Sequence, residues 1–227
     1  MIGRSAERVL GLLAAVGLLI GLYTGFFYAP PDAVQGEVQR IMYLHVPLIL
    51  VSYLAFFVVF VMSLLYLARR SERHDAIAHS SAEIGVLFTA LAIAAGSIWG
   101  RPTWGTWWTW DARLTTTTIL LLIFIGYLML RALVDDPSRG ATFSAVLGIV
   151  GFLDIPIIHM SVVWWRTLHQ PASVIRPGTS TVAPDMKVAL YTNLVAFILL
   201  YGYFMAKRLR LEEARWELSR LRMESLG

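Results

Sequence analysis

The 227-residue sequence is 57% hydrophobic and only 15% charged, and its mean hydropathy is +0.65. An ordinary soluble domain carries roughly 25% charged residues and could not bury this much apolar surface, so we expect one integral membrane domain over residues 1–227. The net charge of +4 therefore bears on loop orientation and gives no reason to expect a nucleic-acid partner. Because the chain has no cysteine, disulfides and thiolate metal sites are excluded as well.

Six apolar stretches are long enough to cross a bilayer, which takes about 20 residues. They cover approximately residues 9–28, 46–67, 83–99, 114–130, 141–158 and 188–205. The first is longer than the apolar part of a usual signal peptide and lacks an obvious cleavage site, so we interpret it as a retained span. The third is rich in Gly and Ala and the fifth contains Asp154 and Pro156, but each separates loops of opposite character. The sequence thus predicts an all-α, six-helix transmembrane bundle.

Lys and Arg residues are distributed unequally between the two sides of these spans. Thirteen of the 19 fall on the side of the two termini, and six fall on the other side. Loops rich in Lys and Arg stay in the cytoplasm, so we expect both termini, including a tail over residues 206–227, to be cytoplasmic. The external segments are then residues 29–45, a tryptophan-rich loop over residues 99–113 and a long loop over residues 159–187.

The external segment over residues 99–115 reads WGRPTWGTWWTWDARLT and holds five of the eight tryptophans. Indole rings favour the membrane–water interface, so one or two of them at a helix end form an ordinary aromatic belt. Five within twelve positions, followed by Asp111 and Arg113, favour instead a platform for a large, flat, partly charged ligand.

Three of the five histidines, His45, His159 and His169, fall on the same external side. A single interfacial histidine is usually structural, but several beside an aromatic platform suit a metal, because neutral imidazole is the commonest metal ligand. Haem fits this set, since its iron takes two axial ligands and its propionates bind cations. Zinc would prefer three or four protein ligands and would have no use for the indoles.

The motif WGRPTWGTWWTWDARLT resembles the tryptophan-rich signature of membrane haem-handling proteins. The motifs MYLHVP and WWRTLHQP, which contain His45 and His169, resemble the loops that supply the two external histidines of those proteins. With six spans, nearly the whole chain is similar to the family of cytochrome c maturation protein C, also called haem exporter protein C. The related cytochrome c haem lyases have many more spans.

This resemblance implies that His45 and His169 are the axial ligands of non-covalently bound haem b at the outer face of the bacterial inner membrane. It implies a platform formed by Trp104, Trp107, Trp108, Trp110 and Asp111. Haem would pass to a periplasmic, membrane-anchored haem chaperone for cytochrome c maturation. The other implied partners are an ABC-type ATPase, its membrane subunit and a small single-span membrane protein. Because the sequence has no Walker A loop, we expect a haem-handling subunit and no enzyme.

Beyond the resemblance, we predict that Arg113 and Arg40 bind the propionates, with Arg166 as a weaker third candidate. The alternative for each is an interfacial arginine that binds lipid phosphate. Arg40 lies five residues before His45, which is about 140° around a helix, so it would have to reach around to the site. Asp154 is a functional candidate because a carboxylate within a span is costly, although we favour a role beside a kink at Pro156.

Two other functions remain open from the sequence. A b-type cytochrome subunit in quinone-linked electron transfer would also bind haem through two histidines, but it would place them within the spans, whereas these histidines lie at span ends and in loops. A substrate-translocating permease would need polar residues throughout the bundle, and the span interiors show few.

Overall fold

In the computed structural model, which describes residues 3–169 and 182–226, six helical segments are long and apolar enough to cross a membrane. They cover Arg4–Tyr28, Glu37–Arg69, Glu72–Trp104, Ala112–Leu133, Pro137–Trp164 and Pro184–Ser225. Each segment contains one of the predicted spans in full. The prediction of an all-α, six-helix membrane protein is therefore confirmed.

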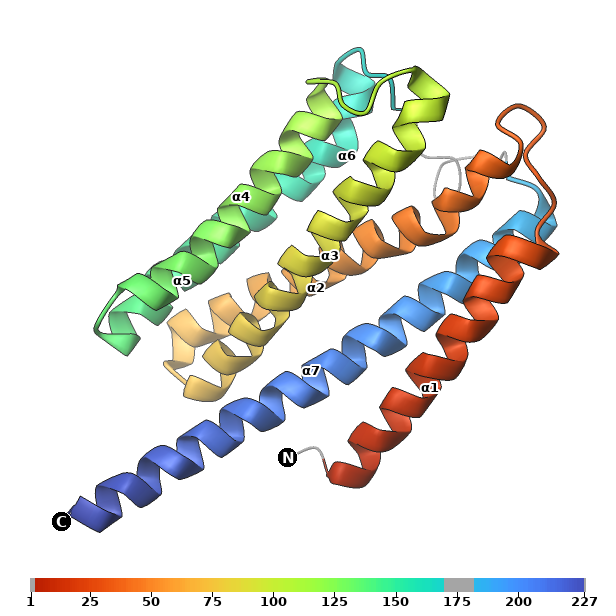
Figure 1. Ribbon diagram of the computed structural model, residues 1–227. Coiled ribbons are helices and arrows are strands. Elements are labelled where there is room, and N and C mark those ends of the chain that lie inside the picture. Colours follow the sequence, from red (N-terminus) through yellow and green to blue (C-terminus); the bar gives the residue numbers. More distant parts are fainter. Residues whose placement is uncertain (1–2, 170–181, 227) are drawn as a thin grey trace.

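Several spans are extended or interrupted relative to the apolar stretches. The α-helices of the described residues are α1 (Arg4–Tyr23), α2 (Met42–Arg69), α3 (Glu72–Trp104), α4 (Ala112–Leu133), α5 (Pro137–Phe152), α6 (Asp154–Trp164) and α7 (Pro184–Leu226). A π-helical turn over Thr24–Tyr28 extends α1, and a 3-10 turn over Glu37–Ile41 precedes α2. The last span and the predicted tail together form the single long helix α7 (Figure 1).

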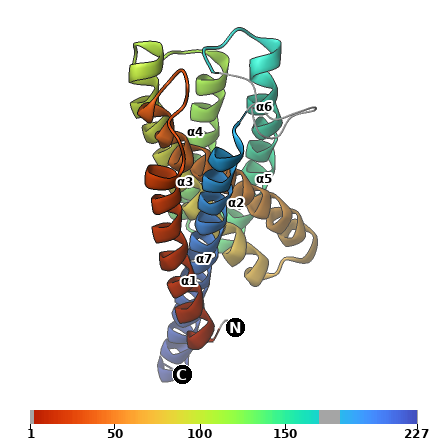
Figure 2. The ribbon, with the colours of Figure 1, turned by 90° about the vertical axis from the view of Figure 1, so that its right-hand side faces the viewer.

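The helices run between two distinct ends of the molecule. Both termini lie at one end, and the connection from α3 to α4 lies at the other, as Figures 1 and 2 show from two directions. Helix α1 packs along α7, and α2 packs along α3. The buried Asn193 of α7 joins the first pair by donating from Nδ2 to the carbonyl oxygen of Gly21 at 2.8 Å. Glycine suits this position because small residues let membrane helices approach closely.

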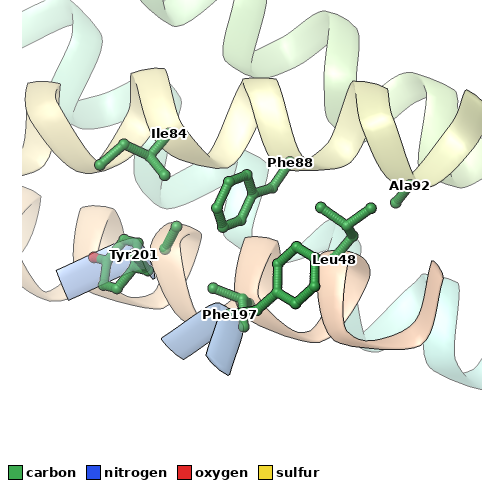
Figure 3. Packing of buried hydrophobic residues seen from close by; sticks show 8 residues of the cluster. Leu48, Ile84, Phe88, Ala92, Phe197 and Tyr201 are labelled. Carbon is green, nitrogen blue, oxygen red and sulfur yellow. The ribbon is translucent and has the colours of Figure 1, made fainter. Parts of the chain in front are cut away.

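A cluster of buried apolar side chains fixes α2 and α3 against α7. Figure 3 shows that Ile84, Phe88 and Ala92 project from α3 towards side chains of the other two helices, which include Leu48, Phe197 and Tyr201. Leu48 lies one helical turn after His45, so this packing fixes the first turns of α2, which carry His45.

Aspartate side chains begin two of the helices. Asp111 Oδ1 accepts from the backbone N–H of Leu114 at 2.9 Å and caps α4, and Asp136 Oδ1 accepts from the N–H of Ser138 at 2.8 Å and caps α5. Such caps satisfy N–H groups that have no partner within the helix. Hydrogen bonds from the Ser138 hydroxyl and from backbone amides hold the pKa of Asp136 below its usual value.

The fifth span is broken where the sequence predicted a kink. Helix α5 ends at Phe152, and α6 begins at Asp154 with Pro156 in its first turn, where a missing N–H costs no helical hydrogen bond. One Asp154 carboxylate oxygen is buried and has no hydrogen-bond partner among the described residues. Both α5 and α6 pack against α4, and α6 lies at the end of the molecule opposite the termini (Figure 1).

Candidate functional site

A cavity of about 710 Å³ lies between the helices near the α3–α4 connection. Its walls come from α2 to α7, from the α3–α4 connection, from the segment after α6 and from Gln35 before the second span. Small-molecule sites typically enclose roughly 300–1,000 Å³ and combine apolar walls with a few polar groups. The predicted residues His45, His169, Trp104, Trp108 and Arg113 all line it.

His45, in the first turns of α2, is held against α3 in one orientation. Its Nδ1 lies 2.8 Å from the carbonyl oxygen of Ala92. A carbonyl can only accept, so Nδ1 carries the proton and donates it, which leaves the lone pair of the neutral ring on Nε2. A backbone bond of this kind at one ring nitrogen is the usual way to orient a histidine that binds metal through the other.

Glycine on α3 makes room for this imidazole. A Cβ at Gly96 would lie 2.8 Å from His45 Cε1 and 3.1 Å from Nδ1, and the first of these distances is shorter than van der Waals contact. The Trp99 ring meets the His45 ring edge-on, with 5.9 Å between centroids. His45 thus occupies a slot that α3 shapes.

His169 reaches the same cavity from the segment that follows α6. Its ring lies edge-on to Trp104, with centroids 6.1 Å apart, so each of the two histidines meets an indole of α3. Its Nδ1 lies 3.2 Å from Nη1 of Arg113. The Arg113 guanidinium also bonds the carbonyl oxygens of Ile158 and His159, each at 3.4 Å. Arg113 therefore connects the start of α4 to both α6 and His169.

Asp111 fixes the segment that carries His169. While Oδ1 caps α4, Oδ2 accepts from the backbone N–H of Leu168 at 3.1 Å. Asp111 is not part of the cavity wall, and its contact with Leu168 positions the chain next to His169.

The predicted tryptophan platform divides into two groups. Trp104 and Trp108 line the cavity, whereas Trp107 and Trp110 lie outside the lining and are 57% and 76% exposed. Trp99 lines the cavity too, and its Nε1 donates to Gln35 Oε1 at 2.9 Å. The sequence motif includes Trp99, but the predicted platform omitted it; the position of Trp99 as the first residue of that motif was the available signal.

Arg40 lies outside the cavity lining. Its Nη1 donates to the carbonyl oxygens of Gly25 and Ala29, at 2.9 and 2.8 Å, and its guanidinium pairs with Glu37. These bonds tie the turn after α1 to the start of the second span. The structure thus gives Arg40 a structural role at this turn, and its predicted binding of a propionate stays a prediction.

Of the remaining candidate residues, one lines the cavity and two do not. His159 lines the cavity, whereas Asp154 and Arg166 do not. Residues 170–181 of the predicted loop 159–187 lie outside the described residues. Within residues 3–169 and 182–226, no group of three or more His, Cys, Asp or Glu side chains could hold a metal ion. His45, His159 and His169 line the cavity from separate elements.

Comparison with known proteins finds relatives along nearly the whole chain. Residues 2–224 match the profile of a family described as Heme exporter protein C. A protein of that name from Bradyrhizobium diazoefficiens is 46% identical over 225 residues, which cover 96% of this chain and 82% of the relative. Another from Escherichia coli is 35% identical over 201 residues, or 88% and 81% of the two chains. A putative cytochrome c biosynthesis ccmC-like mitochondrial protein from Marchantia polymorpha is 36% identical over 185 residues, or 82% and 78%.

Proposed function

Because the chain belongs to the haem exporter protein C family, we propose that its cavity binds haem b through His45 and His169 and presents it for delivery to another protein. The chain is a multi-pass membrane protein with a role in haem handling for cytochrome c maturation. The family name describes a transport subunit and no catalytic activity, so the residues of the cavity are assigned to binding and release.

One observation carries this proposal: two imidazoles from separate elements line a single cavity, and each stands against an indole of α3. His45 presents Nε2, and His169 faces the cavity from beyond α6. Trp104 and Trp108 supply flat apolar surface for a macrocycle. Arg113 is the cation placed to bind a propionate, which is a carboxylate that guanidinium groups recognise well.

The set of donors fits haem better than a bare metal ion. Haem iron has four equatorial nitrogens of its own and takes axial ligands such as histidine from the protein. Covalent attachment of the c type needs cysteine, which the chain lacks. Haem held only by axial bonds and apolar contacts can be released, as a delivery subunit requires.

The exposed tryptophans suit a second task at the rim of the site. Trp107 and Trp110 leave large apolar surfaces uncovered beside the cavity. We assign this rim to a periplasmic, membrane-anchored haem chaperone that accepts the haem. The excess of Lys and Arg on the side of the termini supports a cytoplasmic location for that side, and we therefore assign the cavity to the outer face of the bacterial inner membrane.

Other subunits complete the proposed assembly. An ABC-type ATPase with its membrane subunit would supply ATP hydrolysis, and a small single-span protein would join them. Both candidate ligands lie at the ends of spans: His45 lies in the first turns of α2 and His169 lies beyond α6. Haem bound there is close to an acceptor protein, whereas the haem of an electron-transfer subunit would be held within the spans. This placement favours delivery over the alternative of a b-type cytochrome subunit.

The test uses the double variant His45→Ala/His169→Ala, purified in detergent together with the wild type. We expect the variant to lose haem and to support no transfer to the acceptor chaperone. His74→Ala, at the opposite end of the molecule, is the matched control and should retain both properties. Normal haem content and normal transfer in the double variant would overturn the assignment of the ligands.

A further inference from the structure

The two candidate ligands hold their protons on opposite ring nitrogens. His45 donates from Nδ1 to the Ala92 carbonyl. His169 must accept at Nδ1, because its partner there is the guanidinium of Arg113, which carries only donors. A neutral His169 in this arrangement therefore carries its proton on Nε2, whereas His45 carries its proton on Nδ1.

This difference decides which histidine is ready to bind iron. His45 presents a free lone pair on Nε2. For His169 to bind through Nε2, the proton there must leave and another must be taken up from water at Nδ1, which then can no longer accept from Arg113. If His169 binds through Nδ1 instead, the lone pair engaged by Arg113 must be freed. Either way, the bond between Arg113 and His169 has to break first.

We propose that Arg113 is the specificity-determining residue of the site: a carboxylate of the incoming macrocycle draws its guanidinium away from His169, and only then does that imidazole bind iron. The inference rests on the proposed function, since it assigns an order to the two ligands of that same site. His45 binds first, and His169 binds once the acidic edge of the porphyrin has been recognised.

The bonding of Arg113 favours such an exchange. Its three hydrogen bonds to Ile158, His159 and His169 go to uncharged acceptors at 3.2–3.4 Å. A carboxylate can take two parallel N–H bonds from one guanidinium, and such charge-assisted bonds are shorter and roughly twice as strong as neutral ones. A propionate is therefore a better partner than the three groups it replaces.

The consequence is selection between two macrocycles of nearly the same shape. Iron protoporphyrin with free carboxylates should gain both histidines. Its dimethyl ester offers no carboxylate, so Arg113 stays on His169, and the ester should be held by His45 alone.

The experiment titrates purified full-length protein with haem and with haem dimethyl ester, and follows the spin state of the ferric iron. In the wild type we expect a low-spin, six-coordinate product with haem and a largely high-spin, five-coordinate product with the ester. Arg113→Met should bind haem more weakly but should tighten the second ligation of the ester by about tenfold or more, the range of a lost charged hydrogen bond. Arg113→Gln is a second, polar variant with the same expected direction.

A simple propionate-binding role predicts a different result, because Arg113→Met would then leave binding of the ester unchanged. That outcome, or an ester complex of the wild type as fully six-coordinate as the haem complex, would overturn the inference. Arg166→Met, an exposed cation outside the cavity, is the matched control and should behave as the wild type. Failure of the proposed function is distinguishable, because His45 and His169 variants would then bind haem normally.

Discussion

At the scale of single residues, Asp111 shows how one side chain can serve a site without lining it. One carboxylate oxygen caps α4 and the other holds the backbone of Leu168, next to His169. The resemblance to the tryptophan-rich motif implied that Asp111 belongs to the platform. It could not show that both oxygens are used on backbone N–H groups, because Leu168 is 57 positions away.

Asp111→Ala should therefore weaken His169 as a ligand and leave His45 intact. Loss of the cap should destabilise the start of α4 by about 1 kcal/mol, and the freed Leu168 should let the His169 segment shift. We expect a ferric spectrum with a larger five-coordinate fraction than the wild type. Asp136→Ala removes an equivalent cap at the other end of the molecule and should leave the spectrum unchanged; equal spectra for the two variants would refute the positioning role.

Gly96→Ala should displace His45 directly. The added methyl group would lie 2.8 Å from Cε1 and 3.1 Å from Nδ1 of the imidazole, and Nδ1 is the atom that bonds the Ala92 carbonyl one turn away on the same helix. A helical Gly→Ala change by itself favours the helix by roughly 0.5–1 kcal/mol, so we expect a well-folded protein that binds haem at least tenfold more weakly. Gly202→Ala is the control, since a Cβ there meets nothing within 4 Å. Unchanged haem affinity in Gly96→Ala would contradict the proposed position of His45.

At the scale of elements, hydropathy located every span but not where each helix ends. The predicted third span stops at residue 99, whereas α3 continues to Trp104 and is ended by Gly105, which adopts a positive φ of 79°. Arg101 and Pro102 lower the hydropathy of this last turn without breaking the helix. The extension places Trp99 and Trp104 on one rigid element, which is why each can meet a histidine.

The pair of α1 and α7 offers a test of packing that is separate from the site. Asn193 is 1% exposed and donates to the Gly21 carbonyl across the two helices. Asn193→Ala should lower the unfolding free energy in detergent by about 1 kcal/mol, the order of an interhelical hydrogen bond in a membrane protein, while haem binding stays normal. Thr192→Ala removes a hydroxyl that bonds the Val188 carbonyl within α7 and should change stability less. Equal losses in the two variants would show that the interhelical bond contributes nothing.

At the scale of the whole molecule, the sequence predicted the number of spans and the common side of the termini, because both follow from composition along the chain. It also brought His45, His169 and Arg113 to one end. It could not tell which tryptophans face inward, because Trp107 and Trp108 are neighbours and only one lines the cavity. Nor could it predict the partners of Arg40, which come from the turn after α1 and depend on how that turn packs.

The central claim is that one haem is held between His45 and His169, and electron paramagnetic resonance of the ferric protein tests it most directly. The wild type should give the low-spin signal of iron with two imidazole ligands. His45→Ala and His169→Ala, examined singly, should each convert it to a high-spin signal, while His159→Ala, a third histidine on the same cavity wall, should keep the signal of the wild type. Retention of the two-imidazole signal in both single variants would contradict the account.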